Sequence, residues 1–421
     1  MNIIEKILAN SAVKPEVTPG EIVEANIDVA MTHDLTGPLA IKSFHQIGTK
    51  KVWDNNKVVI VLDHLVPASS VISAGLHKIV RNFAQEQNIK NFYDVGRGGV
   101  CHQVMSERGH VRPGEVIVGS DSHTCTYGAF GAFATGIGST EMAAVFATGK
   151  LWFRVPEVIK VDVSGKFQKL VSSKDLTLKI VGTIGADGAI YKGLVFSGST
   201  IQDMTVDSRM VLTNMAVEMG AKVGIIEPDQ KTLDYVKART SIPFNSVNSD
   251  PDATYEKVVN IDISDLEPQV AVPHSVDNVK SVSEVEDIEI NQGFIGSCTN
   301  GRLEDLREAA KILKGKKIAK SVRLIVIPAS QEIYLMAINE GLINLLMDAG
   351  ATISNPNCGP CLGGHMGIMA DGEACISTSN RNFIGRMGST KSYVYLASPA
   401  TVAASAMTGK ITDPRRKMDR E

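Results

Sequence analysis

The sequence has little of what marks several large classes of protein. Its 421 residues include only 6 cysteines and 5% aromatic residues, and 43 Lys and Arg nearly balance 46 Asp and Glu. A net charge of −3 provides no electrostatic attraction for nucleic acid or for an anionic membrane surface. No apolar run approaches the roughly 18 residues of a transmembrane helix. We therefore expect no nucleic-acid partner and no membrane partner.

The N-terminal segment MNIIEKILAN lacks the apolar core of a secretory signal, because Glu5 and Lys6 interrupt it. We therefore expect a cytoplasmic protein, in which thiols stay reduced. Clustered cysteines in that compartment more often bind metal or act in catalysis than form disulfides.

Short β-branched runs, each followed by a polar loop and then a helical pattern, recur along the chain. Strands are predicted in KVVIVLDHLVP (57–67) and in GEVIVGSDSHTCTYG (114–128). Segment 289–315 predicts a strand, a Cys298 loop and a helix capped by Asn300, and segment 322–350 predicts a strand and one helix from Ser330 to near Gly350. This alternation predicts an α/β fold with mostly parallel sheets and helices on both faces.

A chain of this length is expected to hold two or three domains. A fresh start after the helical pattern at 139–152 and a polar, proline-containing stretch before residue 288 indicate where to divide it. The predicted parts are a first domain at 1–154, a second at 155–268, a connector at 269–287 and a third domain at 288–421.

Acidic and imidazole side chains follow the predicted strands directly. They are Asp63–His64, Asp121–Ser122–His123 and, in the segment GGVCHQVM, His102. Ligands of parallel α/β sheets bind beyond the carboxyl ends of the strands, so these groups are placed where a site is expected. Each alone has an ordinary explanation, since an Asp–His pair is often incidental and DSHT could simply cap a helix.

Cys358 and Cys361 form a CxxC pair in NPNCGPCLGGHMG. A redox dithiol is one reading, although Gly363 and Gly364 follow where such a motif should open a helix. A zinc site completed by Cys298 and His365 is a second reading. The third is an iron–sulfur cluster on Cys298, Cys358 and Cys361, without a fourth thiolate. Spacing alone leaves the three open.

The surrounding residue types favour the cluster. Three thiolates leave one iron open, and an open iron is a Lewis acid that can bind a substrate hydroxyl and carboxylate. Such a centre needs imidazole–carboxylate pairs for proton transfer and cations for the substrate carboxylates. Arg381 and Arg386 in NRNFIGR can supply the cations, although surface ion pairs are the alternative explanation for them.

Several segments together resemble the signature blocks of the aconitase superfamily. They extend over most of residues 30–399 and read, in order, VLDHLVP, CHQ, GSDSHTCTYGAFGAFATGIGSTEMA, FIGSCTNGR, NCGPCLGG and STSNRNFIGRMG. The sequence is similar above all to the two-subunit branch of that superfamily that includes isopropylmalate and homoaconitate enzymes.

The resemblance implies three aconitase-like α/β/α domains, with mostly parallel sheets, around a central [4Fe–4S] cluster. It implies that Cys298, Cys358 and Cys361 bind the cluster and that one iron is not ligated by protein. The implied reaction is dehydration and rehydration of a small hydroxy-dicarboxylate through an alkene. Isopropylmalate, in leucine biosynthesis, is the expected substrate, with homoaconitate, citramalate and dimethylmalate as alternatives. A non-catalytic zinc-binding protein is the alternative of a different class.

The resemblance also implies a role for individual residues. The expected catalytic residues are Asp63, His64, His102, Asp121 and His123. The expected substrate-binding residues are His33, Asp34, Ser122, Arg381 and Arg386.

Two departures from the family pattern qualify these expectations. Single-chain members continue into a swivel domain that supplies the catalytic base, whereas this sequence ends in GKITDPRRKMDRE. We therefore expect a separate small subunit carrying that domain, in a heterodimer or heterotetramer. The second departure is Val195, at a position where the resemblance leads us to expect a glutamate.

Overall fold

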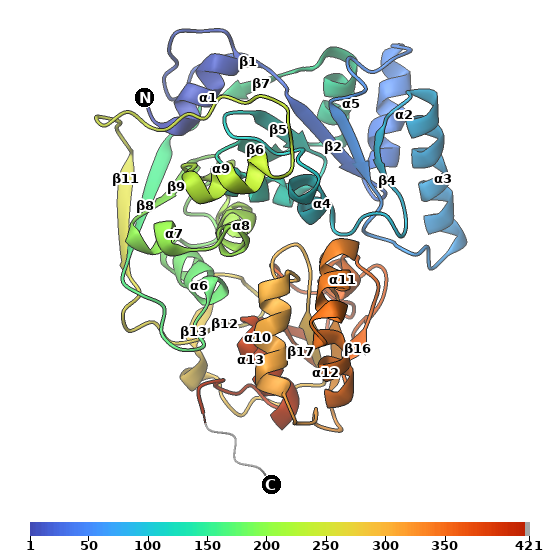
Figure 1. Ribbon diagram of the computed structural model, residues 1–421, viewed down its shortest axis with the longest axis vertical. Helices are drawn as coiled ribbons and strands as arrows, with labels where there is room; N and C mark the ends of the chain where they lie inside the picture. Colours follow the sequence, from blue (N-terminus) through green and yellow to red (C-terminus); the bar gives the residue numbers. More distant parts are fainter. Residues whose placement is uncertain (417–421) are drawn as a thin grey trace. The chain divides into compact units, whose positions relative to one another are not determined.

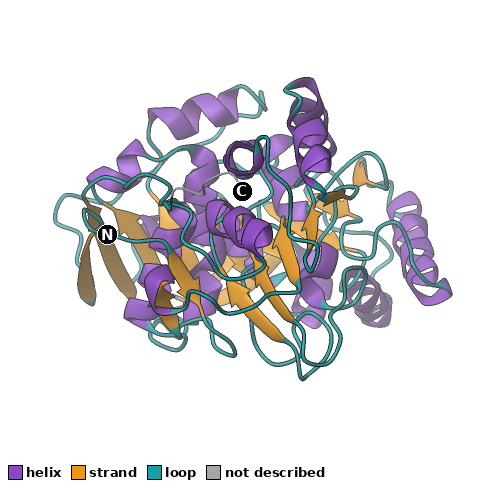
Figure 2. Cartoon of the chain, turned by 90° about the horizontal axis from the view of Figure 1, so that it is seen from below, coloured by secondary structure: helices purple, strands orange, loops and turns teal. Residues whose placement is uncertain are grey.

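The computed structural model describes residues 1–416, which fall into two compact units. Unit 1 comprises residues 1–163 and 187–261, and unit 2 comprises residues 164–186 and 262–416. Each unit combines strands and helices, as Figures 1 and 2 show. The predicted α/β class with mostly parallel sheets is therefore confirmed.

The main sheet of unit 1 has five strands in the order β4-β3-β2-β5-β6, and every neighbouring pair is parallel. The strands are β2 (Val29–His33), β3 (Val58–Val61), β4 (Asn91–Tyr93), β5 (Val116–Gly119) and β6 (Phe133–Gly136). The strands predicted at 57–67 and 114–128 are thus present as β3 and β5.

Unit 1 has two further sheets. The first has the order β10-β9-β8-β11 and contains β8 (Val158–Ser164), β9 (Gly193–Ser197), β10 (Val223–Ile226) and β11 (Lys257–Asp262). The second is the antiparallel pair β1 (Ile22–Asn26) and β7 (Lys150–Arg154). The helices of unit 1 are α1 (Ile3–Ser11), α2 (Gly37–Ile47), α3 (Val71–Glu86), α4 (Cys101–Glu107), η1 (Ser122–Phe130), α5 (Ser139–Thr148), α7 (Ser199–Asp203), α8 (Val206–Asn214), η2 (Met215–Met219) and α9 (Gln230–Lys237).

Both faces of the five-stranded sheet are buried. Val58 and Ile60 of β3 belong to one hydrophobic core, whereas Val59 and Val61 belong to another. Successive strand residues point to opposite faces, so this division means that packing elements cover the sheet on both sides. It also explains why β3 is a continuous apolar run in the sequence.

Unit 2 is built on a seven-stranded sheet in the order β13-β12-β18-β17-β14-β15-β16. Its strands are β12 (Gln269–Ala271), β13 (Val279–Ser281), β14 (Gln292–Ile295), β15 (Arg323–Val326), β16 (Thr352–Ile353), β17 (Ala374–Ser377) and β18 (Tyr393–Leu396). Its helices are α6 (Ser173–Ile184), η3 (Val282–Glu284), α10 (Leu303–Leu313), α11 (Gln331–Asn339), α12 (Leu342–Ala349), η4 (Gly359–Leu362) and α13 (Pro399–Thr408).

Two local predictions for unit 2 need correction. The helix expected from Ser330 to Gly350 begins at its predicted cap, but it is two helices, because Gly341 adopts a left-handed φ of 72° between α11 and α12. Helix α10 is capped at Arg302 rather than at Asn300, with Asp305 completing the capping box. The polar segment 269–287 contains β12 and β13.

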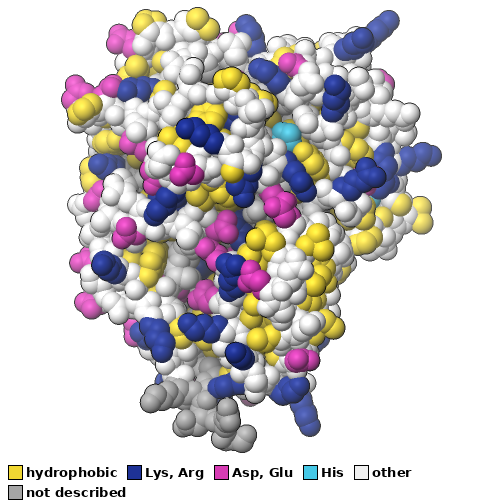
Figure 3. All heavy atoms as spheres, in the orientation of Figure 1, with side chains coloured by type: hydrophobic (Ala, Val, Ile, Leu, Met, Phe, Trp, Pro, Cys, Tyr) yellow, Lys and Arg dark blue, Asp and Glu magenta, His cyan; other side chains and the backbone are white. Residues whose placement is uncertain are grey.

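Exposed apolar side chains gather on α11 and α12 on the face of unit 2 seen in Figure 3. They include Leu335, Met336 and Met347, which are 60%, 43% and 58% exposed. Within residues 1–416, no helix is long and apolar enough to span a membrane.

A close approach of two backbones joins η1 to β10. A Cβ atom added to Gly128 would lie 1.7 Å from the carbonyl oxygen of Gly224, so only glycine fits at residue 128. The glycine at residue 128 therefore serves the close packing of η1 against β10.

We expect Gly128→Ala to lower the free energy of unfolding by about 2–3 kcal/mol, since the new methyl group must displace backbone. Gly75 on α3 is the matched control: its added Cβ meets nothing within 4 Å, so Gly75→Ala should stabilise by about 0.5–1 kcal/mol. Thermal and denaturant unfolding of both variants checks this. Equal midpoints for the two variants would contradict the proposed role of the contact.

Candidate functional site

The predicted acidic and imidazole residues of unit 1 do meet at one edge of the main sheet. Strand β2 lies between β3 and β5 and is parallel to both. His33–Asp34 lie at the carboxyl end of β2, Asp63–His64 follow β3, and Asp121 follows β5. Because parallel strands bring their carboxyl ends to the same edge, side chains from three segments that are distant in sequence become neighbours.

Asp34 holds the turn that follows β3. Its Oδ1 accepts hydrogen bonds from the backbone N–H groups of Asp63 and His64 at 3.0 Å each, and its Oδ2 accepts from Leu65 N–H at 2.8 Å. His77 Nε2 lies 3.2 Å from the same Oδ2. Burial alone would raise the pKa of Asp34, but the hydrogen bond from His77 and the neighbouring imidazoles hold this pKa far below its ordinary value.

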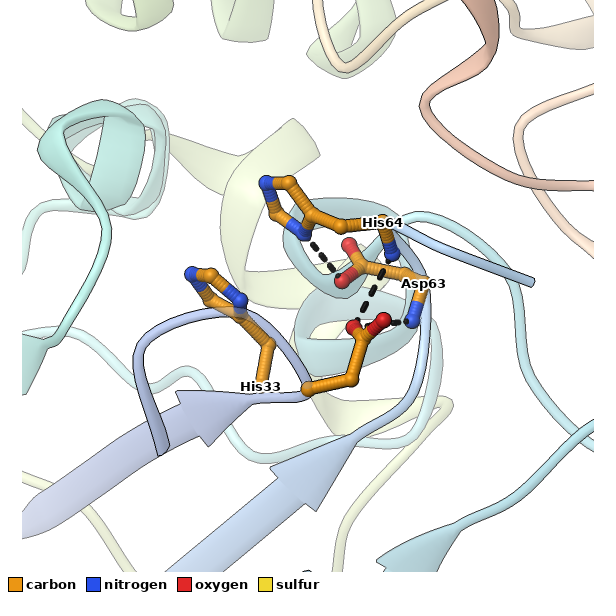
Figure 4. Close-up of side chains that lie close together, drawn as sticks. His33, Asp63 and His64 are labelled. Carbon is orange, nitrogen blue, oxygen red and sulfur yellow. Dashed lines mark hydrogen bonds and ion pairs between the residues drawn. The ribbon is translucent and has the colours of Figure 1, made fainter. Parts of the chain in front are cut away.

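His64 is oriented by its sequence neighbour and by His33 (Figure 4). Its Nδ1 lies 2.6 Å from Asp63 Oδ1, and its ring stacks on that of His33 with 4.0 Å between centroids. Asp63 Oδ2 in turn accepts a hydrogen bond from Cys101 N–H at 2.6 Å, which ties α4 to the site. The Nε2 atom of His64 is therefore the nitrogen that points away from Asp63.

Potential metal-binding atoms of His33, Asp34, Asp63 and His64 lie within 4.8 Å of one another. Hydrogen bonds from backbone and imidazole N–H groups already engage the carboxylate oxygens of both aspartates. The two aspartates therefore act as hydrogen-bond acceptors that support the two histidines of this group.

Asp121 is the common partner of four imidazoles. His102 Nε2 lies 2.9 Å from Oδ1, and the nearest ring nitrogens of His33, His64 and His123 lie 3.5, 3.6 and 3.6 Å from the carboxylate. The backbone N–H of His123 also donates to Oδ1 at 2.7 Å. Burial opposes ionisation of Asp121, but its hydrogen bonds with these imidazoles outweigh burial and lower its pKa well below the ordinary value.

His102 has a defined proton arrangement. Burial lowers its pKa and outweighs the opposing effect of Asp121, so the neutral ring is favoured at neutral pH. With Asp121 ionised, Nε2–H of His102 donates to the carboxylate, and Nδ1 accepts from the hydroxyl of Tyr127 at 3.0 Å. This tautomer follows from the hydrogen-bond partners of the ring.

A further carboxylate was not found from the sequence. Glu218 Oε1 in η2 lies 2.8 Å from Nε2 of His123, 95 residues earlier in the chain. The sequence draws attention to Val195, but that side chain is buried in β9, and the carboxylate beside His123 comes from Glu218. The sequence gives little indication of a role for Glu218, because a single glutamate in MAVEMG resembles any helical surface residue.

The three predicted cluster cysteines are all buried in unit 2. Cys298 follows β14, Cys361 lies in η4 and Cys358 caps η4. The amide of Asn380, after β17, connects two of them: its Nδ2 lies 3.3 Å from Cys298 Sγ and its Oδ1 lies 3.8 Å from Cys361 Sγ. Cys298 lies after β14, Cys361 lies in the loop after β16, and Asn380 lies after β17, so this one amide links the loops that follow three strands.

The two predicted arginines lie in the same loop region of unit 2, after β17, and both are half-buried. Arg386 Nη2 lies 3.6 Å from Cys361 Sγ. The Nε of Arg386 is buried and has no hydrogen-bond partner within residues 1–416. A buried guanidinium nitrogen without a partner beside a thiol is a donor available to a bound anion. In unit 1, Ser122 is half-buried at the start of η1.

The fold and these groups describe an α/β protein with a buried three-thiol site and an imidazole–carboxylate network. The family model of aconitase (aconitate hydratase) matches residues 5–287 and 278–409. The chain belongs to the aconitase family.

Relatives cover nearly all of the chain. A protein of Methanothermobacter thermautotrophicus named as a probable 3-isopropylmalate dehydratase large subunit is 60% identical over 98% of this chain and 99% of its own length. A 3-isopropylmalate dehydratase large subunit of Methanopyrus kandleri is 59% identical, with 98% of each chain covered. A probable methanogen homoaconitase large subunit of M. thermautotrophicus is 54% identical over 99% of this chain and 98% of its own.

Among solved structures, Thermococcus kodakaraensis aconitase X in its holo-form matches 85% of this chain and 84% of its own, with 14% identity and a TM-score of 0.49.

Family membership implies an iron–sulfur cluster, and the residues of unit 2 fit such a group. Three buried thiols provide the thiolate ligands that clusters require. Hydrogen-bond donors of Asn380 and Arg386 lie against two of the sulfurs, as expected for sulfur atoms that carry negative charge. The remaining cysteines are elsewhere: Cys375 is inside β17, and burial raises the pKa of its thiol to about 12.

We expect Asp34→Asn to lower the free energy of unfolding by about 2–4 kcal/mol at pH 7, because a buried charge with four donors is lost. The pKa of Asp34 is depressed in the folded state, so its contribution is present above the unfolded pKa of about 4 and disappears as the pH falls below it. The difference between wild type and variant should therefore shrink between pH 5 and lower values.

Denaturant unfolding at a series of pH values measures this difference. Asp252→Asn is the control, since Asp252 is an exposed aspartate of unit 1 and its substitution should leave the curve unchanged. A constant gap between wild type and Asp34→Asn from pH 7 to pH 3 would contradict the assigned charge state.

Proposed function

We propose that this chain is the large subunit of a 3-isopropylmalate dehydratase, a hydro-lyase of leucine biosynthesis. It would interconvert 2-isopropylmalate and 3-isopropylmalate through isopropylmaleate by removing water and adding it back. The observation that carries this proposal is the identity of 59–60% to two relatives of that name over 98% of this chain. The geometry of both units supports the reaction type.

Cys298, Cys358 and Cys361 would hold a [4Fe–4S] cluster, one iron of which is not ligated by protein. When bound, this group supplies a Lewis acid for the substrate hydroxyl and a carboxylate. Support comes from the burial of all three cysteines and from the Asn380 amide beside two of their sulfurs.

The residues of unit 1 would move protons and orient the hydroxyl. His64, held by Asp63 through Nδ1, has Nε2 directed for exchange of a proton with the leaving hydroxyl. Asp121, ionised among four imidazoles, keeps His102 in one tautomer and stabilises positive charge that develops on its neighbours. His123 would act in the same network, with Glu218 fixing its ring.

The predicted substrate-binding residues separate into two kinds. Arg381 and Arg386 would hold substrate carboxylates, and the unpartnered Nε of Arg386 supports that assignment. His33 and Ser122 would contact the substrate from the ends of β2 and β5. For Asp34, whose oxygens hold the backbone of residues 63–65, a positioning role is better supported than substrate contact.

The partner is proposed to be a small subunit that carries the swivel domain, in a heterodimer or heterotetramer. The names of the relatives describe large subunits, which implies a small one. We assign to it the base that takes the proton from carbon and much of the selection of the substrate side chain. A cytoplasmic location is part of the proposal.

The family domains are proposed at 1–154, 155–268 and 288–421, joined by 269–287. Each proposed domain corresponds to one of the three larger sheets: the five-stranded sheet, the four-stranded sheet and most of the seven-stranded sheet. The strands β12 and β13 in the connector extend the last of these.

A homoaconitase large subunit is the second candidate, because one relative of that name is 54% identical. Citramalate and dimethylmalate are further candidate substrates. A non-catalytic zinc protein using Cys298, Cys358, Cys361 and His365 is the alternative from another class, and metal analysis distinguishes it.

After anaerobic reconstitution with iron and sulfide, we expect the wild-type chain to hold four irons and four sulfides. Cys358→Ser should lose most of both, because a thiolate ligand is removed. Cys375→Ala is the matched control: this buried cysteine is inside β17, and its variant should keep the cluster. Zinc without acid-labile sulfide in the wild type would rule out the proposed cofactor.

With the cognate small subunit, the loaded chain should convert 2-isopropylmalate, and absorbance of the alkene intermediate follows the reaction. The chain alone should show less than about a hundredth of that rate, because the base that takes the proton from carbon is absent.

His102→Asn should lower kcat about 100-fold or more in the complex, since proton transfer by a positioned group contributes a factor of about 10²–10⁴ to the rate. Full turnover by the chain alone would refute the two-subunit proposal. Faster turnover of homocitrate or citramalate would refute the assigned substrate.

A further inference from the structure

Unit 2 contains two cations that are removed from solvent almost completely. Lys174 is 0% exposed and Arg302 is 1% exposed. Lys174 is the second residue of α6, and Arg302 is the N-cap of α10. Both positions are unfavourable for a positive charge, because burial removes its hydration and the helix N-terminus is the positive end of the helix dipole. Such placements call for a compensating negative charge.

Each cation donates to two consecutive backbone carbonyls. Lys174 Nζ lies 2.8 Å from the carbonyl oxygen of Thr378 and 2.6 Å from that of Ser379. Arg302 donates through Nη1 to the Thr299 carbonyl at 2.7 Å and through Nη2 to the Cys298 carbonyl at 2.9 Å. These four carbonyl oxygens carry no net charge.

The two pairs of carbonyls belong to the loops that surround the thiols. Cys298 follows β14 and Asn380 follows β17, and these strands are parallel neighbours. Asn380 Nδ2 contacts Cys298 Sγ and also donates to Thr299 Oγ1 at 2.9 Å. Thr378 Oγ1 accepts from Gly296 N–H at 3.0 Å, which ties the β17 loop to the β14 loop. Both cations therefore act on one structural assembly, the one that holds Cys298.

Two buried carboxyl groups, Asp175 and Asp305, belong to the same helices as these cations. Burial raises the pKa of Asp305 to about 7 and that of Asp175 to about 6, so a full negative charge is not retained on Asp305 at neutral pH. Burial lowers the pKa of Lys174 to about 7, and the charges of Asp305, Cys298 and Cys361 oppose that decrease. The sulfur site is thus among the negative charges that keep Lys174 protonated.

We propose that Lys174 and Arg302 are positioning residues that offset the negative charge of the thiolate-bound cluster and thereby raise its reduction potential. This inference rests on the proposed [4Fe–4S] cluster. One-electron reduction adds one negative charge to the cluster without forming or breaking a bond to protein. A buried positive charge favours the more negative state, because the attraction is little screened in the interior. The same attraction makes the cluster harder to oxidise, and oxidation is the route by which air destroys it.

The test uses Lys174→Gln and Arg302→Gln, which keep N–H donors for the carbonyls and remove only the charge. Lys179 on α6 and Arg307 on α10 are exposed, so Lys179→Gln and Arg307→Gln are matched controls from the same helices. Each full-length protein is reconstituted anaerobically with iron and sulfide. The cluster is then titrated with dithionite against redox dyes and followed by visible absorbance and electron paramagnetic resonance.

We expect the equilibrium constant for one-electron reduction to fall at least tenfold in Lys174→Gln and in Arg302→Gln, which is a potential lower by about 59 mV. Bleaching of the cluster in air should be correspondingly faster. Both control variants should match wild type. If one of the two neutral variants fails to fold, the reduction potential of the other variant tests the proposal. Lys174→Arg is a further check, because it keeps the charge and should keep the wild-type potential.

The outcomes separate this inference from the function on which it rests. Wild-type potentials in cluster-loaded Lys174→Gln and Arg302→Gln would overturn the electrostatic role and leave the cluster assignment intact. A shift as large in Lys179→Gln or Arg307→Gln, or a lowered potential in Lys174→Arg, would overturn it as well. Wild-type protein without iron and sulfide would instead overturn the proposed cofactor.

Discussion

A charge that is removed from water must find hydrogen-bond partners or opposite charge inside the protein, and several candidate functional groups of this chain are such charges. Asp34 and Asp121 in unit 1, and Lys174 and Arg302 in unit 2, are stabilised by arrays of backbone and side-chain groups. Each of these arrays holds the charged group at hydrogen-bond distance from its partners. Burial of charge therefore makes these sites rigid, and it also explains why single changes in them should be costly.

Parallel sheets provide the geometry that makes this burial possible. In unit 1, the ends of β2, β3 and β5 bring carboxylates and imidazoles together from positions that are 30 to 90 residues apart in the chain. In unit 2, the ends of β14 and β17 bring Cys298 and Asn380 together. Loops after parallel strands leave backbone N–H and carbonyl groups unpaired by the sheet, and the buried charges use them. The N–H groups of residues 63–65 serve Asp34, and the carbonyls of residues 378–379 serve Lys174.

The residues and elements that can be predicted from the sequence are those whose pattern lies within one short segment. Asp63–His64, the CxxC pair and the strand β3 lie within short segments whose composition is itself informative. Glu218, Lys174 and Arg302 have no such signal, because their roles depend on contacts with residues that are 3 to 205 positions away. The two helices α11 and α12 were predicted as one, since Gly341 is a weak breaker in a sequence that is apolar on both sides. The roles of the site residues remain predictions that the experiments above address.

The buried charges of Asp121 in unit 1 and Lys174 in unit 2 differ in how they are stabilised. Asp121 is surrounded by donors that are part of the chain, so its ionised form is stable before any ligand binds. Within residues 1–416, the hydrogen bonds of Lys174 go to carbonyl oxygens, and burial lowers its pKa to about 7. Negative charge at Asp305 and at the thiols opposes that decrease and favours the charged form of Lys174. Because electrostatic coupling is reciprocal, a group that raises the pKa of the lysine is itself held more tightly by the lysine. The buried charge of Lys174 would therefore give unit 2 a preference for an anionic, thiolate-bound group over neutral thiols.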